Sequence, residues 1–308
     1  MSLAGQTPAG QLREAFRRVF RGQTTAALVV PLLLFDLLVF VVPFGYLLRI
    51  SLTERVTAQA YAEGTWSLDG YDYLLSAPTL REVFLFTLGF AAVTTLVAVV
   101  VAVVYAYAMW QASGALRVVL TAGVLVSLFT AIVVKLFAAV LVFSPNGVVN
   151  SLLVGLGLLD EPLLLVNNAV GAVLAQLYIV VPYAVLAVYS VLSTVEESLL
   201  EAARDLGAGR LRAFRAVVIP HVVPGLLVAG VISFTWSVGA YAAPLLVGSG
   251  SERTAGMAVS NLLLDQFDWP AASALAVVVT VTVFATLALG QALVSRYTVS
   301  SGFGGDRS

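Results

Sequence analysis

Six long apolar runs constrain the fold of this chain more than any other feature. A helix rises about 1.5 Å per residue, so crossing a hydrocarbon layer of about 30 Å takes about 20 apolar residues. Each run is at least that long, and in lipid the backbone polar groups of each must bond within their own segment. The sequence therefore predicts an all-α integral membrane protein with six transmembrane helices. The runs are 26–52, 82–110, 118–143, 167–193, 222–248 and 272–296.

Composition excludes the common soluble classes. Of 308 residues, 60% are apolar and 11% are charged, and the mean hydropathy is +0.99. A soluble domain usually has about 25% charged residues, and its single core could not bury this much apolar surface. A soluble enzyme, a nucleic-acid-binding protein and a disordered chain are therefore excluded, and membrane lipid is the expected surroundings. The chain has no cysteine and one histidine, His221, so no metal site is expected.

The positions of the basic residues predict the orientation. Eleven of the sixteen lie in the N-terminal tail, the 111–117 and 194–221 loops and the C-terminal end. The loops on the opposite side hold three, Arg55, Arg81 and Arg253, together with most of the acidic residues. Because cytoplasmic loops are enriched in Arg and Lys, both termini and the 194–221 loop are predicted to be cytoplasmic.

Three regions follow from this topology. Residues 1–25 are predicted to form a cytoplasmic tail with an amphipathic helix at 10–21 on the membrane surface. The membrane domain covers residues 26–296, and a cytoplasmic tail covers 297–308. The location expected is the cell (inner) membrane, crossed several times.

The 194–221 loop reads as two short amphipathic helices separated by a break at Gly207–Gly209. Leu199, Ala203 and Leu206 share one face of the first helix. Neither helix is long enough to be stable alone in water. The loop must therefore dock on the chain's own membrane domain or on a cytoplasmic partner, and periodicity does not distinguish the two.

The same loop resembles the signature of the permease subunits of ABC importers. Glu201-Ala202-Ala203 is followed after three residues by Gly207 and after nine more by Val217-Val218-Ile219-Pro220. The departures from the family pattern are Val217 and Ile219, both exchanges between apolar side chains. Other stretches resemble the spermidine/putrescine branch of these permeases. They are 146–153, 198–208, 241–248, Asn261, Gln266-Phe267 and Trp269-Pro270.

This resemblance implies a type I importer permease fold with cytoplasmic coupling helices. It also implies several partners: a second permease subunit, cytoplasmic ATPase subunits and an extracytoplasmic substrate-binding protein. The small-molecule substrate implied is a polyamine, with iron, thiamine or phosphonate as alternatives. The 194–221 loop would be the coupling loop that docks on the ATPase. The coupling residues implied are Glu201, Ala202, Ala203, Asp205, Gly207 and Arg210.

The chain lacks the motifs of an ATP-hydrolysing enzyme. A P-loop needs a Gly-rich segment ending in Lys followed by Ser or Thr, whereas Lys135 is the only lysine and lies between Val134 and Leu136. No cofactor is therefore expected in this chain, and ATP and magnesium would be bound by the partner ATPase. A stand-alone secondary transporter and a membrane-embedded enzyme are the alternatives.

Polar residues within the apolar runs are the candidates for a translocation path. A charge at the depth of Asp36 costs about 2.5–3.5 kcal/mol, so this carboxylate should face the bundle interior, water or an opposite charge. Lys135 either extends toward the outer interface or pairs with Asp36. The fifth run is the most polar, which fits a pore-lining face or close packing of small residues. The predicted path residues are Asp36, Lys135, Gln176, Ser233, Trp236, Ser237 and Tyr241, with Tyr183 as a further candidate.

Overall fold

The computed structural model describes residues 30–56, 59–196, 198, 202–203, 205–250 and 252–302. These residues form helices and connecting loops and contain no strand, which confirms the all-α prediction. Within them, six helices are long and apolar enough to cross a membrane. The amphipathic helix predicted at 10–21 lies outside the described residues. The six helices are Val30–Ile50, Pro78–Gln111, Ile132–Gly155, Ala169–Leu192, Phe214–Val238 and Trp269–Arg296.

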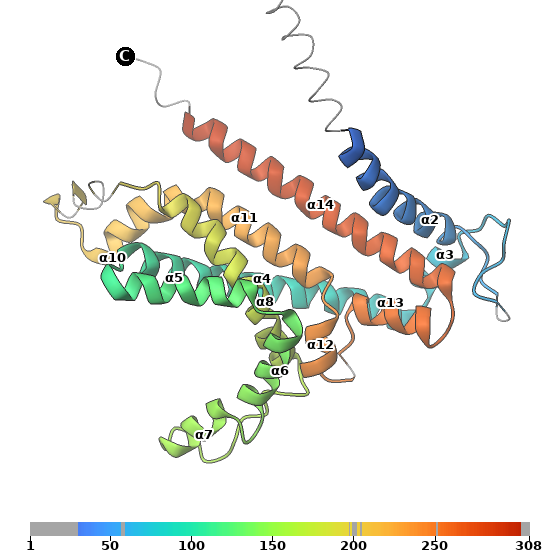
Figure 1. Cartoon of the computed structure of the whole chain (residues 1–308), viewed down its shortest axis with the longest axis horizontal. Helices are drawn as coiled ribbons and strands as arrows, with labels where there is room; N and C mark the ends of the chain where they lie inside the picture. The colour runs from blue at the N-terminus through green and yellow to red at the C-terminus, as the bar shows by residue number, and fades with distance from the viewer. Residues whose placement is uncertain are drawn as a thin grey trace, which may run out of the picture.

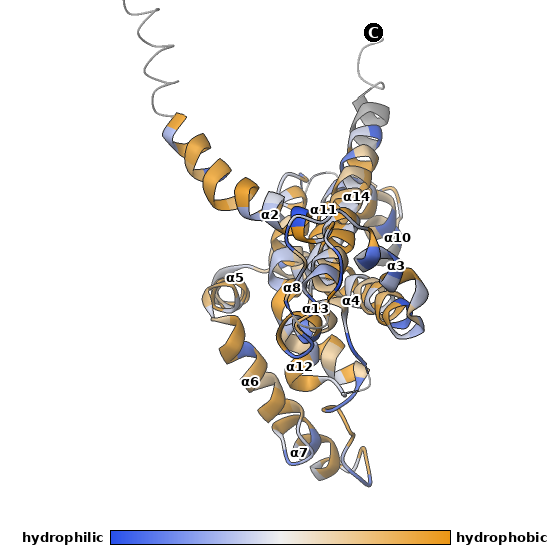
Figure 2. Ribbon diagram, turned by 90° about the vertical axis from the view of Figure 1, so that its right-hand side faces the viewer, coloured by the Kyte–Doolittle hydropathy of each residue, from blue (hydrophilic) through white to orange (hydrophobic). Residues whose placement is uncertain are grey.

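The prediction of one helix over the third run, 118–143, is wrong. The run contains α5 (Gly114–Phe129) and α6 (Ile132–Phe143), separated by extended residues Thr130 and Ala131. The Thr130 hydroxyl donates to the Val126 carbonyl at 2.6 Å, so it competes for a helical acceptor at the end of α5. α5 packs along α8, and α6 packs on α8 and α12, whereas α7 (Val148–Gly155) extends away from the bundle (Figures 1 and 2).

The fifth run also differs from its predicted single helix. α11 (Ile219–Val238) ends at Gly239, and the rest of the run forms the short helix α12 (Ala242–Val247). At its other end, α11 continues the helical segments α10 (Arg210–Ala213) and η2 (Phe214–Val218) without interruption. The polar part of this run therefore lies at the end of a helix that starts in the 194–221 loop.

The core of the bundle is formed by α4 (Pro78–Gln111), α8 (Ala169–Leu192) and α11, which pack on one another. Small residues lie where the helices meet. Ala98, Ala102 and Ala106 of α4 are fully buried and recur every four residues. Small side chains let helix backbones approach closely, which compensates for the weak hydrophobic driving force between helices in lipid.

The first membrane helix is packed very differently. η1 (Leu37–Val41) and α2 (Val42–Ile50) have one buried residue between them, Ile50. At its C-terminal end α2 lies beside α3 (Asp69–Ser76) in Figure 1, and α14 (Trp269–Gly302) packs on α2, on α3 and on α13 (Ala255–Leu264). We call this the outer end, because the charge distribution predicts that it faces the outside. Figure 2 shows α2 projecting away from the bundle from this end as an apolar ribbon.

We expect Gly225→Val to destabilise the bundle, because a Cβ at Gly225 would lie 2.9 Å from the Ala187 carbonyl oxygen of α8. Helices forced apart in a packed core typically lose about 1–3 kcal/mol. The measurement is the melting temperature of the purified protein in detergent. Gly89→Val is the control, since no heavy atom lies within 4 Å of a Cβ there. Equal melting temperatures for the two variants would contradict the packing described for α8 and α11.

Candidate functional site

The break predicted in the 194–221 loop is present. Ala202, Ala203 and Asp205 are helical, Leu206 and Gly207 form a turn, and the helix resumes at Arg210. Gly207 has φ +84°, a left-handed conformation that favours glycine. Asp205 is exposed and Ala203 is half-buried, so the predicted coupling residues present both a solvent face and a packed face. Glu201 lies outside the described residues.

The packed face of this loop rests on the end of the bundle where α4 ends. Ala203 and Ala208 contact a buried cluster that includes Met109 and Trp110 of α4. The Phe214 ring lies edge-on to Tyr107 of α4, with the centroids 4.8 Å apart, a favoured aromatic geometry. Periodicity left open whether the loop docks on a partner or on the chain's own membrane domain. For this face, the structure shows that it docks on the chain's own membrane domain. Leu206 remains 90% exposed and points to no part of the described bundle.

Two predicted path residues, Gln176 and Trp236, and the further candidate Tyr183 come together where α8 faces α11. Gln176 is buried, and its Nε2 donates to the Trp236 carbonyl oxygen at 3.4 Å. The Tyr183 ring stacks on the Trp236 indole with centroids 5.8 Å apart. Trp236 is still 40% exposed and Tyr241 is 42% exposed. The surface presented here is therefore aromatic. The buried side-chain amide of Gln176 bonds to the backbone beneath the Trp236 indole.

The two predicted serines of α11 are enclosed, although Ser233 is only three residues from the exposed Trp236. Ser233 and Ser237 are fully buried, three and seven residues after Gly230, whose Cβ position is 3.9 Å from Thr95 of α4. Residues at this spacing share a helix face, so both serines face α4. Their hydroxyl oxygens have no hydrogen-bond partner. In this conformation the serines are enclosed between helices and line no open surface.

The two predicted charges of the membrane domain are not brought together. Asp36 is exposed at the start of η1, whereas Lys135 is 6% exposed on α6. Their helices lie apart in both views (Figures 1 and 2). The pair proposed from sequence does not form, because α6 packs on α8 and α12 while η1 leaves the bundle.

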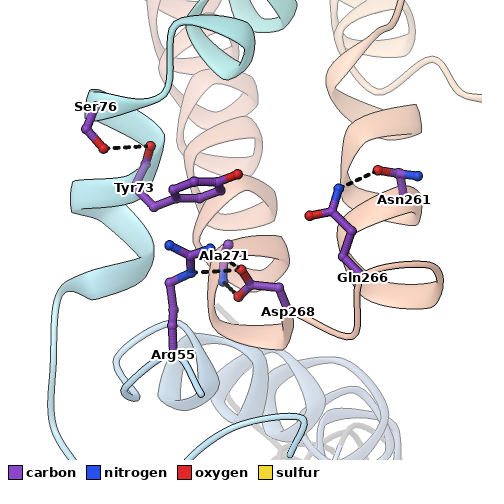
Figure 3. A network of polar contacts seen from close by, with 7 residues as sticks. All are labelled: Arg55, Tyr73, Ser76, Asn261, Gln266, Asp268 and Ala271. Carbon is purple, nitrogen blue, oxygen red and sulfur yellow. Dashed lines mark hydrogen bonds and ion pairs between the residues drawn. The ribbon is translucent and has the colours of Figure 1, made fainter. Parts of the chain in front are cut away.

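Arg55 and Asp268 form the ion pair found in the described part of the chain, at the outer end (Figure 3). Arg55 Nε donates to Asp268 Oδ2 at 2.8 Å, and Oδ1 of the same carboxylate accepts from the Ala271 amide at 3.1 Å. The Arg55 guanidinium also lies over the Tyr73 ring, 3.6 Å from its centroid. The contacts join the segment after α2 to the start of α14.

Sequence reasoning assigned Arg55 and Asp268 to the same side of the membrane but did not pair them. A usable signal was present, because Asp268 directly precedes Trp269-Pro270 at the start of an apolar run. Aspartate before a proline-initiated helix is a typical N-cap. Identifying its arginine partner needed the fold. Among the described residues no group of three or more His, Cys, Asp or Glu could hold a metal ion.

Comparison with known proteins shows to which family this architecture belongs. The model of the family described as binding-protein-dependent transport system inner membrane component matches residues 98–299, about two thirds of the chain. The chain belongs to this family. The chain is thus a multi-pass inner-membrane permease of an ABC transporter, and the family is one of transport proteins, not enzymes.

Curated relatives of the permease include two spermidine/putrescine transport system permease proteins PotB. The Escherichia coli protein is 27% identical over 222 residues, which cover 72% of this chain and 80% of the relative. The Haemophilus influenzae protein is 24% identical over 257 residues, covering 83% and 88%. A solved bacterial alginate ABC transporter, in complex with a periplasmic protein bound to an alginate pentasaccharide, matches with TM-score 0.73. It is 16% identical, covers 92% of this chain and 98% of the solved chain, and so shows the fold alone.

We expect Trp236→Ala to lower the rate of solute uptake by the assembled transporter. The change removes the exposed indole and the ring on which Tyr183 stacks. A tenfold fall in rate, equivalent to about 1.4 kcal/mol, is the expected size. Trp236→Phe should keep most of the rate, because it retains an aromatic face. The control is Trp66→Ala, which removes an exposed indole from an outer loop. Normal uptake by Trp236→Ala would exclude this face from the path.

Proposed function

We propose that this permease forms, with a second permease subunit, the membrane path of an ATP-driven importer for a small solute. An extracytoplasmic binding protein delivers the solute. Cytoplasmic ATPase subunits dock on the 194–221 loop and hydrolyse ATP, while this chain binds neither ATP nor magnesium. Both termini lie in the cytoplasm, because the basic residues gather on that side.

The observation that carries the proposal is the uninterrupted helix from Arg210 to Val238. One end of this helix follows the turn at Gly207, and the other presents Trp236. A displacement of the docked loop therefore moves the aromatic face as part of the same rigid element. This supports coupling between ATP hydrolysis at one end and a change of solute access at the other.

A polyamine is the solute we propose. The relatives named for spermidine and putrescine support this choice. A polycation is also attracted by aromatic faces, which stabilise a desolvated ammonium by about 2 kcal/mol without an acidic partner, and Trp236 with Tyr183 offers such a surface. Acidic residues outnumber basic ones on the predicted outer side, which favours the approach of cations.

Reconstitution tests the function as a whole. The permease, its second permease, the ATPase and the binding protein are placed in liposomes with labelled spermidine or putrescine, with and without ATP. ATP-dependent uptake that requires the binding protein is the expected result. Uptake driven by an ion gradient without the ATPase would contradict the importer. ATP-dependent uptake of iron, thiamine or phosphonate alone would contradict the polyamine and leave the importer standing.

We expect Gly207→Asp to abolish co-purification of the ATPase and solute uptake while leaving expression intact. The substitution places a side chain in a left-handed turn and a new negative charge on the docking loop. Glu201→Arg should have the same effect through charge reversal. Gly157→Asp is the matched control, since Gly157 has φ +69° and equally open surroundings but lies between α7 and α8. Undiminished uptake by Gly207→Asp would refute the assignment of this loop.

A further inference from the structure

An apolar groove lies between α4, α5 and α8. α4 and α8 are two of the helices that are long and apolar enough to cross a membrane. The groove has a volume of about 330 Å³. Val101 is 38% exposed and Tyr178 is 37% exposed, so the groove is open to the surroundings of the bundle. Its walls include Val101 of α4, Val124 and Ser127 of α5, and Tyr178, Val181 and Val185 of α8.

Residues of all three helices give the groove its shape. The Tyr105 hydroxyl of α4 donates to the Leu120 carbonyl oxygen of α5 at 2.9 Å. A Cβ at Gly123 would lie 3.1 Å from the same hydroxyl oxygen, so glycine leaves room for this contact. Pro182 lies inside α8 and has no amide hydrogen to donate to the Tyr178 carbonyl, an arrangement that typically bends a helix. The groove is therefore a specific feature of how these helices pack.

A cationic side chain lies beyond one end of the groove. Arg117, in the first turn of α5, donates from Nη2 to the Tyr189 hydroxyl of α8 at 2.9 Å. Arg117 precedes Val124 by seven residues, and Tyr189 follows Val185 by four. Residues at these spacings share a helix face, so both belong to the faces that line the groove. The hydrogen bond thus holds the guanidinium where α5 meets α8.

Arg117 has capacity for an anionic ligand. Among the described residues, its hydrogen-bond partner is Tyr189, and the ion pair present is that of Arg55 with Asp268. A guanidinium has five N–H donors and stays charged, and Arg117 is exposed. Its planar fork fits the oxygens of a phosphate, with which it forms charge-assisted hydrogen bonds. A phosphate is therefore a suitable ligand at this end of the groove.

The distance from the charge to the far end of the groove matches one leaflet of a bilayer. Arg117 precedes Ser127 by ten residues, which is about 15 Å along a helix. Half of a hydrocarbon core of about 30 Å has this thickness. A phospholipid has its phosphate at the edge of the core and its acyl chains within it. Its charged and apolar parts are therefore spaced as Arg117 and the groove are.

The size of the groove also favours an acyl chain over a helix of another subunit. A helix is about 10 Å wide with its side chains, so a 15 Å length of it occupies roughly 1,200 Å³. The groove holds about 330 Å³, which is too little to seat such a segment. A single acyl chain is thin and flexible enough to enter.

We propose that the groove binds an acyl chain of an anionic phospholipid whose phosphate is held by Arg117. The lipid belongs to the leaflet on the side of the 194–221 loop, since Figure 1 shows α5 beginning at the end of the bundle where α10 lies. A zwitterionic lipid fits less well, because its own cation would repel the guanidinium. Basic sites between membrane helices bind lipid head groups in this way. The bound lipid joins α5 to α8, the helix whose Gln176 and Tyr183 contact Trp236.

A photoreactive lipid tests the site directly. The full-length permease, with the subunits that purify with it, is placed in phosphatidylcholine vesicles that contain phosphatidylglycerol with a diazirine in one acyl chain. Illumination expels dinitrogen and leaves a carbene, which inserts into a neighbouring bond. Mass spectrometry should locate the adducts on peptides that line the groove. Unlabelled phosphatidylglycerol should reduce this labelling, whereas glycerol phosphate, which has no acyl chain, should not.

Substitutions separate the two parts of the site. Arg117→Gln removes the charge and should lower groove labelling about tenfold, the effect of one charge-assisted hydrogen bond, whereas Arg117→Lys should retain most of it. Val101→Trp fills the groove and should lower labelling as much. Val104→Trp is the matched control, because Val104 is on the same helix, is 66% exposed and does not line the groove. Tyr189→Phe removes the partner of Arg117 and should leave labelling unchanged.

Several results would overturn the proposal. Wild-type protein without adducts in the groove would exclude the lipid, including the case in which another subunit covers this surface. Equal labelling by phosphatidylcholine and phosphatidylglycerol probes, or unchanged labelling in Arg117→Gln, would refute the role of the charge. A loss of labelling in Tyr189→Phe equal to that in Arg117→Gln would show that Arg117 acts only through its contact with α8. Melting temperatures of the variants in detergent show whether the bundle is intact, and the wild-type adducts do not depend on any variant.

Discussion

Close contact between helices through small side chains is the constraint on which this structure depends. In lipid, apolar side chains gain little by meeting one another, so α4, α8 and α11 associate through backbone proximity and dense packing. The fully buried Ala98, Ala102 and Ala106 form a face of small side chains on α4. On α11, Gly225 allows the backbone of α8 to approach closely. Large side chains occupy the surfaces that are left for lipid or for a partner.

This packing separates the core helices from helices that extend beyond them. The three core helices form one body, and the 194–221 loop is attached to it by Phe214 and Tyr107. α2 and α7 extend away from that body (Figures 1 and 2), whereas α6 packs against it on α8 and α12. A single subunit therefore has a densely packed centre, from which α2 and α7 extend with mostly exposed apolar side chains.

The sequence predicted the parts of the fold that depend on composition and charge. Six apolar runs gave the all-α class, and the glycines at 207 and 209 gave the break in the 194–221 loop. The break between α5 and α6 was not predictable from the pattern, because apolar residues flank Thr130 on both sides and no glycine or proline lies at the break. Its position reflects the packing of α6 on α8 and α12, a tertiary contact that periodicity does not contain.

The sequence indicated which residues could belong to the candidate site, but it did not indicate which of them are exposed or in contact. Helical spacing placed Ser233 and Trp236 on one face, but the indole is exposed while the hydroxyl is enclosed against α4. Which part of a polar face is open depends on the neighbouring helix. For the same reason the pairing of Asp36 with Lys135 could not be decided, since two charges of similar depth can lie on helices that diverge.

The ion pair between Arg55 and Asp268 limits how α2 and α14 can move relative to each other. It joins the first and last membrane helices at their outer ends, and from there α2 and α14 diverge (Figure 2). A pair of rods joined at one end can change its opening angle while the joint stays intact, and the displacement is then largest at the free ends. These two helices can therefore follow large movements at the ends far from the ion pair while the subunit keeps its shape around the pair.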